Sequence, residues 1–391
     1  MSSLALAAVL AALYWPATSL QGVFFVGDIY RLGYPARATY GEALREGRIP
    51  LWTPDALGGY PVLAEGQTGA YYPLNLLLYR CLPVPVALNY SVLLSLWLAG
   101  AGLFAYVRRL GLRWGAAFVA ACAFMLGGFL PGHLNHLNML AAAAWLPWLL
   151  WAAERAEEAG RRRRWVLVAV LFGMQGLAGH PQVSLLSAIL VAGYALVGPL
   201  THDAGDSWPA RLRRLVCCGV ALALGACLAM VQWAPTYELT RLSQRGHGLE
   251  SEFFTSFSLH PARWITLLSP FAAGNPYPLT SLETIGYVGA LPIVAAALTP
   301  WRRRDRLVAF WMGVAGLALF LALGRWNPAY RLLLHVPLLN MFRAPARYLL
   351  WFDLGVAVLA AVTIDSLQRV GSTQRGSRQW PGLVVGVLLV G

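Results

Sequence analysis

The chain has 391 residues, of which 58% are hydrophobic and only 12% are charged. Soluble domains carry about 25% charged residues, so this composition excludes an ordinary soluble enzyme and indicates an integral membrane protein. The net charge of +13 comes from arginine, since no lysine is present, and the arginines are divided among short segments beside apolar runs. This distribution excludes a nucleic-acid surface, which needs basic residues gathered on one solvated face.

A helix that crosses the hydrocarbon layer needs about 20 apolar residues, and fewer where its neighbours thin the bilayer. The sequence therefore predicts an all-α polytopic membrane protein of about 10 to 11 transmembrane helices, forming a single transmembrane domain over 1–391, with short interfacial helices in its outer loops. We expect spans near 4–26, 86–107, 115–131, 138–153, 165–178, 183–200, 215–234, 284–300, 307–323 and 346–366, with another beginning at 380.

The first apolar run indicates whether a signal peptide is cleaved, and the last one indicates whether the protein continues beyond this sequence. Met1–Leu20 lacks the basic segment that begins a cleaved signal, so we expect 4–26 to remain as an anchored helix. The run from 380 is too short to span. We therefore expect the sequence to be the front portion of a longer protein that has a further C-terminal part.

Arginine clusters occupy every second connection between the predicted spans, at 108–113, 155–164, 211–214, 302–306 and 369–378. Basic loops remain on the cytoplasmic side of a membrane. The alternating connections then face outward, and these are 27–85, 132–137, 179–182, 235–283 and 324–345. The first outer loop, 27–85, and the second large one, 235–283, carry most of the unusual polar residues.

Asp28 is the first candidate for chemistry because it directly follows the first apolar run. The partial negative charge at the end of a helix, together with burial, would raise the pKa of such a carboxylate toward the range of a general base. Its alternative role is to cap the loop. Pro35 suits the first turn of a helix and Gly47 suits its end, so 35–46 is predicted to be a short helix along the membrane surface.

Two outward turns repeat the pattern Gly-His-x-amide, Gly132-His133-Leu134-Asn135 and Gly179-His180-Pro181-Gln182, and His136 follows closely. The run 165–200 contains two short spans, so we expect its turn to lie below the surface and to place His180 inside a site. These histidines would contact a sugar or a phosphate, bind a divalent metal, or cap their turns. The spacing matches no HExxH-type metal motif.

Arg343 and Arg347 flank Pro345, which fits the first turn of the span at 346–366. Two arginines beside a helix N-terminus predict an anion site, and the alternative is a pair of interfacial arginines that reach lipid headgroups. Glu283 is the second candidate carboxylate, either orienting an acceptor, pairing with one of these arginines, or simply solvated. Asp353 lies inside the span, so we expect it to face a polar interior or to pair with arginine.

An ordered set of short motifs resembles the bacterial YfhO family across nearly the whole chain. The motifs are Asp28, Tyr40-Gly41-Glu42-Ala43-Leu44-Arg45-Glu46-Gly47, Ile49-Pro50-Leu51-Trp52, Gly58-Gly59-Tyr60-Pro61, Gln67 through Tyr72-Pro73-Leu74-Asn75, Ala144-Trp145-Leu146-Pro147, Gly179-His180-Pro181-Gln182, Glu283 with Tyr287-Val288-Gly289, and Arg343-Ala344-Pro345-Ala346-Arg347. That family resembles polytopic glycosyltransferases of the GT-C fold. The resemblance implies an enzyme of the bacterial cytoplasmic membrane that moves a sugar from a polyprenyl-phosphate carrier to a cell-envelope polymer or glycan on the outer face.

In this reading Asp28 is the base and Glu283 the second catalytic carboxylate. His133, His136, His180, Gln182, Gln67, Arg343 and Arg347 bind the substrates. The displacement is expected to invert the sugar, with membrane lipid as a further partner and a divalent metal as a possible cofactor. Two alternatives remain open, a transporter or flippase of a lipid-linked or envelope substrate, and a non-catalytic membrane assembly protein.

Overall fold

The computed structural model describes residues 2–54, 58–158, 162–200, 207–243, 249–272, 274 and 282–374. These residues form a bundle of α-helices with short 3-10 segments, and the one strand-like pairing among them is an isolated bridge between Thr53 and Tyr60. The predicted all-α class is therefore confirmed for the described part of the chain. The apolar run that begins at 380 lies outside the described residues.

The α-helices are α1 (Ser2–Leu13), α2 (Trp15–Thr18), α3 (Tyr34–Arg45), α4 (Val62–Glu65), α5 (Pro73–Cys81), α6 (Val84–Arg109), α7 (Trp114–Met125), α8 (Phe129–Gly132), α9 (Leu137–Ala143), α10 (Leu146–Glu158), α11 (Trp165–Leu177), α12 (Pro181–Val197), α13 (Trp208–Arg241), α14 (Ser251–Phe254), α15 (Ala290–Arg302), α16 (Arg306–Ala322) and α17 (Leu349–Gln374). One π-helical turn, η1 (Ile29–Gly33), precedes α3. The 3-10 segments are η2 (Arg162–Arg164), η4 (Pro261–Leu267), η5 (Leu282–Thr284), η6 (Gly324–Trp326), η7 (Pro328–His335), η8 (Leu339–Met341) and η9 (Pro345–Tyr348).

Four described helical segments are long and apolar enough to cross a membrane, namely α6, α7 continued into α8, α13, and η9 continued into α17. They differ in how far the rest of the bundle covers them. In the most apolar stretch of η9–α17, 89% of the residues are buried, against 28% in α13. A helix that is apolar all round belongs at the centre of a bundle, whereas α13 exposes apolar side chains along its length.

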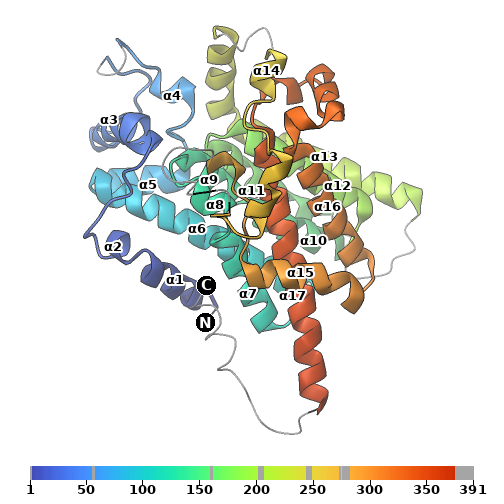
Figure 1. The fold of residues 1–391 in the computed structure, drawn as a ribbon. Helices are drawn as coiled ribbons and strands as arrows, with labels where there is room; N and C mark the ends of the chain where they lie inside the picture. Colours follow the sequence, from blue (N-terminus) through green and yellow to red (C-terminus); the bar gives the residue numbers. More distant parts are fainter. Residues whose placement is uncertain are drawn as a thin grey trace.

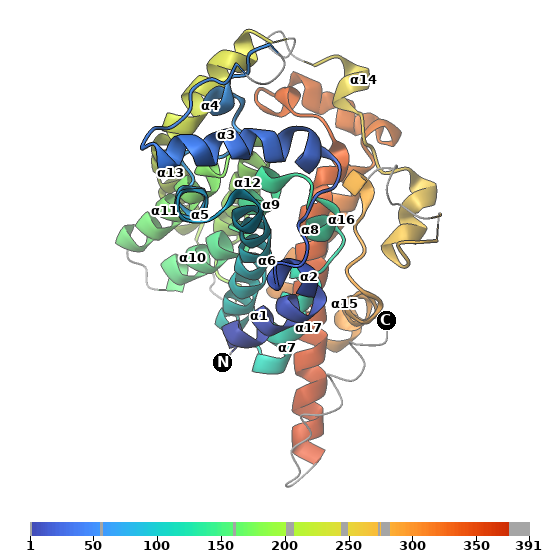
Figure 2. The ribbon, with the colours of Figure 1, turned by 90° about the vertical axis from the view of Figure 1, so that its left-hand side faces the viewer.

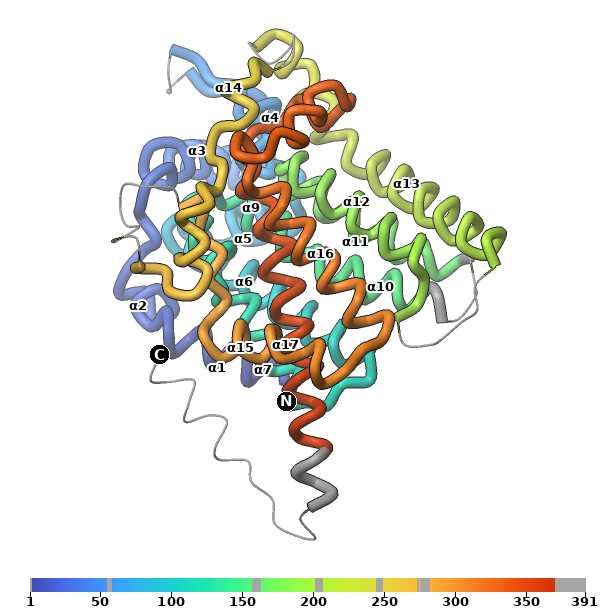
Figure 3. The backbone as a smooth tube through the Cα atoms, turned by 45° about the vertical axis from the view of Figure 1, so that its right-hand side comes forward, coloured from blue at the N-terminus to red at the C-terminus, as the bar shows by residue number. Residues whose placement is uncertain are grey.

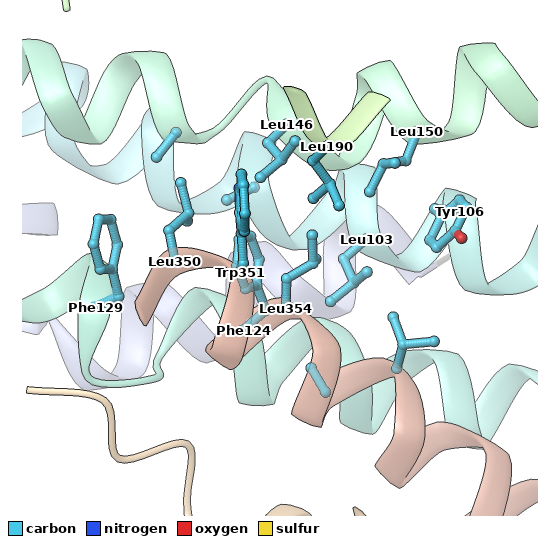
Figure 4. Packing of buried hydrophobic residues seen from close by; sticks show 14 of the residues in the cluster. Leu103, Tyr106, Phe124, Phe129, Leu146, Leu150, Leu190, Leu350, Trp351 and Leu354 are labelled. Carbon is cyan, nitrogen blue, oxygen red and sulfur yellow. The ribbon is translucent and has the colours of Figure 1, made fainter. Parts of the chain in front are cut away.

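Helix α17 packs against α7, α15 and α16 along its first part, and Figures 1, 2 and 3 show its C-terminal turns extending beyond the rest of the bundle. Figure 4 shows how the core is built at this centre, with Trp351 and Leu354 of α17 lying among Leu103 of α6, Phe124 of α7 and neighbouring leucines. These side chains are almost completely buried. Burial of a leucine or a phenylalanine is worth about 1.5–3 kcal/mol where water is the alternative.

The first predicted span, 4–26, is wrong as a continuous helix. Helix α1 ends at Leu13, α2 covers one turn, and Leu20 then adopts a positive φ of 60°, which redirects the chain. Asn89 of α6 holds this non-helical backbone, because its side chain donates to the carbonyls of Ala17 and Gly22. Asp28 consequently does not follow the end of a membrane-spanning helix.

The predicted span 138–153 is also interrupted, since α9 ends at Ala143 and α10 begins at Leu146. Pro147 explains the break, because a proline has no N–H with which to continue the hydrogen bonding of a preceding helix. The helix predicted over 35–46 is confirmed as α3, which has Pro35 in its first turn, and Gly47 follows with a φ of 77°. Its position along a membrane surface stays a prediction.

The two ends of the bundle differ in character. Helices α3, α4 and α14 gather at the end where α17 begins (Figures 1 and 2). At the opposite end, the backbone N–H of Arg113 and the side chain of Arg369 both bind Asp365, near the end of α17. Arg347 and Asp365 are separated by roughly 27 Å along the helix at 1.5 Å per residue. The two ends are thus about one hydrocarbon thickness apart.

Candidate functional site

Four side chains from distant parts of the sequence meet beside the beginning of α17. Arg347 donates from Nε and Nη2 to the two carboxylate oxygens of Glu283, at 3.0 and 2.7 Å. Its Nη1 donates to Oε1 of Gln182 at 2.6 Å. The carboxylate of Glu283 also contacts His133, whose Nε2 lies 3.1 Å from Oε2 of Glu283. We call His133, Gln182, Glu283 and Arg347 the ionic cluster.

Small residues allow the backbone to bring this cluster together. The segment after η5 lies directly on α8, where Gly128 donates its N–H to the carbonyl of Tyr287 at 2.7 Å. A Cβ on Gly128 would lie 2.5 Å from a side-chain carbon of Ile285, closer than carbon atoms can pack. The glycine therefore permits the approach that places Glu283 beside His133.

Asp353 of α17 supports the same region. Its Oδ2 accepts the backbone N–H of Phe129 at 3.0 Å, at the first residue of α8. The sequence predicted a polar interior or an arginine partner for this carboxylate, and that expectation is wrong, because the partner is a backbone amide in an otherwise apolar core. Asp353 thus fixes the start of the short helix that leads to His133.

Both ring nitrogens of His133 face hydrogen-bond acceptors. Nδ1 lies 2.6 Å from the carbonyl oxygen of Phe129, and Nε2 faces the Glu283 carboxylate. A neutral imidazole carries only one N–H, so a singly protonated ring donates to one of these two acceptors. His133 is thus held between the carbonyl of Phe129 and the carboxylate of Glu283.

This arrangement determines the charge state of Glu283. Burial by itself would raise the pKa of the Glu283 carboxyl, but the Arg347 guanidinium and His133 lower that pKa well below its usual range. Since Arg347 donates to both carboxylate oxygens, the carboxylate is a poor proton acceptor. The geometry therefore favours the orienting and pairing roles predicted for Glu283 over proton abstraction, and its predicted pairing with an arginine is confirmed by Arg347.

Asp28 and His136 lie at the rim of the cluster. Oδ2 of Asp28 is 3.5 Å from Nε2 of His136, and their side chains are 48% and 22% exposed. Burial and the charge of His133 lower the pKa of His136 to about 4 against the opposing effect of Glu283, so its imidazole is neutral at pH 7. Nδ1 of His136 is buried and has no hydrogen-bond partner among the described residues. Asp28 is the most accessible carboxylate in this group.

His180 caps the start of α12, where its Nδ1 accepts the backbone N–H of Val183 at 3.2 Å. The turn-capping alternative is therefore confirmed. Burial, Arg347 and His136 together lower the pKa of His180 well below its usual value, so the ring is neutral and Nε2 carries its proton. The preceding Gly179 accepts from Asn138 at 2.8 Å, which fixes this turn against α9.

Arg343 and Gln67 are not members of the ionic cluster. The guanidinium of Arg343 stacks over Phe253 and Phe257, 4.8 and 5.4 Å from the ring centres, while its backbone carbonyl accepts from Gln182. Arg343 and Arg347 thus point to different partners. The side chain of Gln67 is exposed, and its backbone is held between Glu65 and Arg37.

The residues that could hold a divalent metal are His133, His136 and Glu283, whose ligand atoms all lie within 4.8 Å of one another. His133 has the outer contact common in metal sites, a ring N–H bonded to a backbone carbonyl. Arg347 nevertheless already binds both Glu283 oxygens, and its positive charge opposes a second cation. The structure supplies a donor set for a metal, and metal binding stays a prediction.

Arg37 is the polar residue of this region that sequence reasoning missed. It lies in α3 and is only 4% exposed. The signal was present in its spacing, since Arg37, Tyr40 and Leu44 recur every three or four residues along one face of a short helix, and that face is buried. An arginine on the apolar face of an amphipathic helix is a candidate for a ligand contact.

No protein-family model matches this chain, and no curated protein sequence matches it. The functional argument therefore depends on the residues themselves and on their geometry.

Proposed function

We propose that this protein is a membrane glycosyltransferase that moves a sugar from a polyprenyl-phosphate carrier to a hydroxyl of a cell-envelope acceptor. The observation that carries the proposal is the pair formed by an accessible carboxylate, Asp28, and a neutral imidazole, His136, beside a buried ionic cluster. A base that is open to an acceptor and lies next to fixed positive charge is what phosphate displacement from a sugar requires.

In the proposed reaction, Asp28 accepts the proton of the acceptor hydroxyl. The acceptor oxygen forms a bond to the anomeric carbon, the bond from that carbon to the phosphate oxygen breaks, and polyprenyl phosphate leaves with the electron pair. One displacement inverts the anomeric configuration. Glu283 and Gln182 hold Arg347 in place, and this arginine retains N–H groups beyond its three observed bonds for a substrate oxygen.

We also propose that the site faces outward from a bacterial cytoplasmic membrane. Arg113 and Arg369 lie at the end of α17 opposite to the ionic cluster. Since basic connections remain in the cytoplasm, this separation supports an extracytoplasmic site. The donor would then approach from the outer leaflet and the acceptor from the external water.

The proposal is tested with purified full chain in nanodiscs and with polyprenyl-phosphate glucose and polyprenyl-phosphate mannose as donors. Asp28→Asn is expected to lower kcat by about 10²- to 10⁴-fold, the usual contribution of a general base. Glu46→Gln is the matched control, because Glu46 is an exposed carboxylate at the end of α3. Wild-type turnover by Asp28→Asn would remove Asp28 from the mechanism.

The alternative transport function predicts a different readout. A flippase would move the labelled lipid across the vesicle bilayer without forming a glycosylated product, and its activity would survive Asp28→Asn. An assembly protein would do neither. Measuring product formation and lipid movement on the same preparation therefore separates the three functions.

A further inference from the structure

A short segment between α14 and α15 exposes a group of large apolar side chains. We call residues 261–271, which contain η4, the apolar turn. Its exposed apolar side chains are those of Trp264, Ile265, Leu268 and Phe271. Leu268 and Phe271 are each 61% exposed, and Arg263 is the one charged residue of the turn. Single apolar residues are common on protein surfaces, whereas a group of them in a short segment marks an interaction surface.

The start of the apolar turn is tied to the end of α16. The backbone N–H of Leu259 donates to the carbonyl of Ala322, the last residue of α16, at 2.8 Å. Helix α16 begins at Arg306 in an arginine-rich connection, so Ala322 lies roughly 24 Å from that end at 1.5 Å per residue. This distance is shorter than the hydrocarbon layer of a membrane, which is about 30 Å thick. The apolar turn therefore begins at a depth that the hydrocarbon layer covers.

A second contact places the middle of the turn at the start of α17. Leu267 is buried, and a Cβ on Gly286 would lie 3.0 Å from Cδ2 of Leu267 and 3.1 Å from Cδ2 of Leu349. Leu349 is the first residue of α17 and belongs to a segment that is long and apolar enough to cross a membrane. Figure 2 shows the apolar turn in gold on the outside of the bundle, below α14 and near the height of α8. The turn thus lies where two apolar helices end, below the outermost loops.

The backbone of the apolar turn bonds to itself. Arg263, Leu268, Ser269 and Ala272 each donate a backbone N–H to a carbonyl three or four residues earlier. The hydroxyl of Thr266 donates to the carbonyl of Arg263 at 2.6 Å. Hydrocarbon offers no hydrogen-bond partner, so a segment that faces lipid has to bond its polar groups internally. The apolar turn meets this requirement at these positions.

The other side of the apolar turn covers the segment that follows Glu283. Residues 285–289 form neither helix nor strand, yet Ile285, Gly286 and Val288 are buried. Leu267 lies over this segment at Gly286. Irregular backbone is tolerated at membrane depth only where protein covers it. The turn therefore has one side packed on the segment after Glu283 and one side that is exposed.

We propose that the exposed side of the apolar turn is embedded in the membrane lipid at the ionic-cluster end of the bundle. Its partner is the boundary between phospholipid headgroups and acyl chains, where tryptophan is favoured and leucine and phenylalanine reach the chains. The depth that Leu259 and Leu267 set favours lipid over a water-soluble partner. Through Leu267 and Gly286, the embedded turn also holds the segment that carries Glu283 at a fixed depth.

The experiment places photoreactive p-benzoylphenylalanine at single positions of the full chain in phosphatidylcholine nanodiscs and measures lipid adducts by intact-mass spectrometry after irradiation. Leu268 is the test position. Leu224, exposed on the membrane-spanning α13, is the positive control, and Glu252, exposed in α14, is the negative control. We expect the adduct yield at Leu268 to approach that at Leu224. It should exceed the yield at Glu252 by at least about 10-fold, because a side chain of this size prefers apolar surroundings to water by that factor or more.

Phe271 is a second test position, because p-benzoylphenylalanine keeps its phenyl ring, and it remains decisive if the Leu268 variant does not fold. Yields at both positions no higher than at Glu252 would overturn the proposal. A crosslink to a second chain in place of lipid would also overturn it, and would identify the turn as a surface between copies. Neither readout requires sugar transfer, so this test stands whether or not the proposed transferase function holds.

Discussion

Glu283 and Arg347 form a two-bond ion pair that ties the segment before α15 to the segment before α17. Their side chains are 9% and 13% exposed, so solvent contributes little to satisfying either charge. His133 and Gln182 attach the same pair to α8 and α12. One ion pair therefore joins four segments, and its removal is expected to affect both folding and the site.

Glu283→Gln is expected to destabilise the fold by about 3–5 kcal/mol, because it leaves Arg347 as a buried cation without its anion. The free energy of unfolding in detergent measures this effect. The double variant with Arg347→Gln should recover part of the loss, since it removes the stranded guanidinium. A loss below about 1 kcal/mol for Glu283→Gln alone would show that the ion pair is not held in this geometry.

The stability of the fold is expected to depend on pH through His136. Its pKa is lowered from 6.5 to about 4 in the folded state, chiefly by burial and by the charge of His133. Between these values the unfolded chain binds the proton and the folded chain does not, so stability rises with pH across this window. The contribution is present above about pH 6.5 and is lost toward pH 4, with a total of order 3 kcal/mol.

His136→Gln should remove this slope from unfolding curves recorded between pH 4 and pH 7. The control is His335→Gln, since His335 is an exposed histidine in η7. Glu283 affects stability at lower pH than His136 does. Its pKa is lowered in the folded state, so its stabilising contribution is lost only when the pH falls through the acidic range. An unchanged slope in His136→Gln would mean that another group titrates.

Gly179 and Gly193 provide a matched pair of glycines, one before α12 and one within it. Gly179 has a φ of +84°, and a Cβ there would lie 2.0 Å from the carbonyl oxygen of Gly66, whereas nothing lies within 4 Å at Gly193. Gly179→Ala is expected to cost at least about 2 kcal/mol, from the strained backbone and the clash with rigid backbone. Gly193→Ala should instead stabilise the helix by up to about 1 kcal/mol. Equal unfolding free energies for the two variants would contradict the close contact between the first loop and the His180 turn.

The residue patterns that are local in sequence predicted the structure well. Pro35 and Gly47 delimit α3, and Pro345 lies in the first turn of η9. The first span failed because hydropathy records only that 4–26 is apolar. It does not record that Asn89, from α6, binds the backbone of residues 17–24 and stabilises a non-helical path there. A hydrogen bond between segments 65 or more residues apart has no local signal.

The candidate site shows the same division between local and distant information. Turn patterns identified His133, His180, Glu283 and Arg347 one at a time, and the structure brings three of them into the ionic cluster. The sequence does not show which of Arg343 and Arg347 pairs with Glu283. Ala344, between them, adopts a positive φ of 68°, which changes the direction of the backbone, and Arg347 is the arginine that reaches Glu283. Arg37 escaped notice because a single arginine in a short helix resembles a solvated residue until the partners of that helix are known.

Asp353 offers a test of how the core of α17 positions the site. Its Oδ2 binds the Phe129 N–H, whereas Oδ1 is buried without a partner among the described residues. Asp353→Asn retains an acceptor for the amide on a side chain of the same size, so its stability should equal or exceed that of the wild type. Asp353→Leu leaves the N–H of Phe129 unsatisfied and is expected to cost about 1–3 kcal/mol. Because Phe129 also accepts from His133, Asp353→Leu should reduce turnover as well, while Asp353→Asn should not. If both variants lost activity equally at unchanged stability, the carboxylate would be acting through its charge instead of through the α8 backbone.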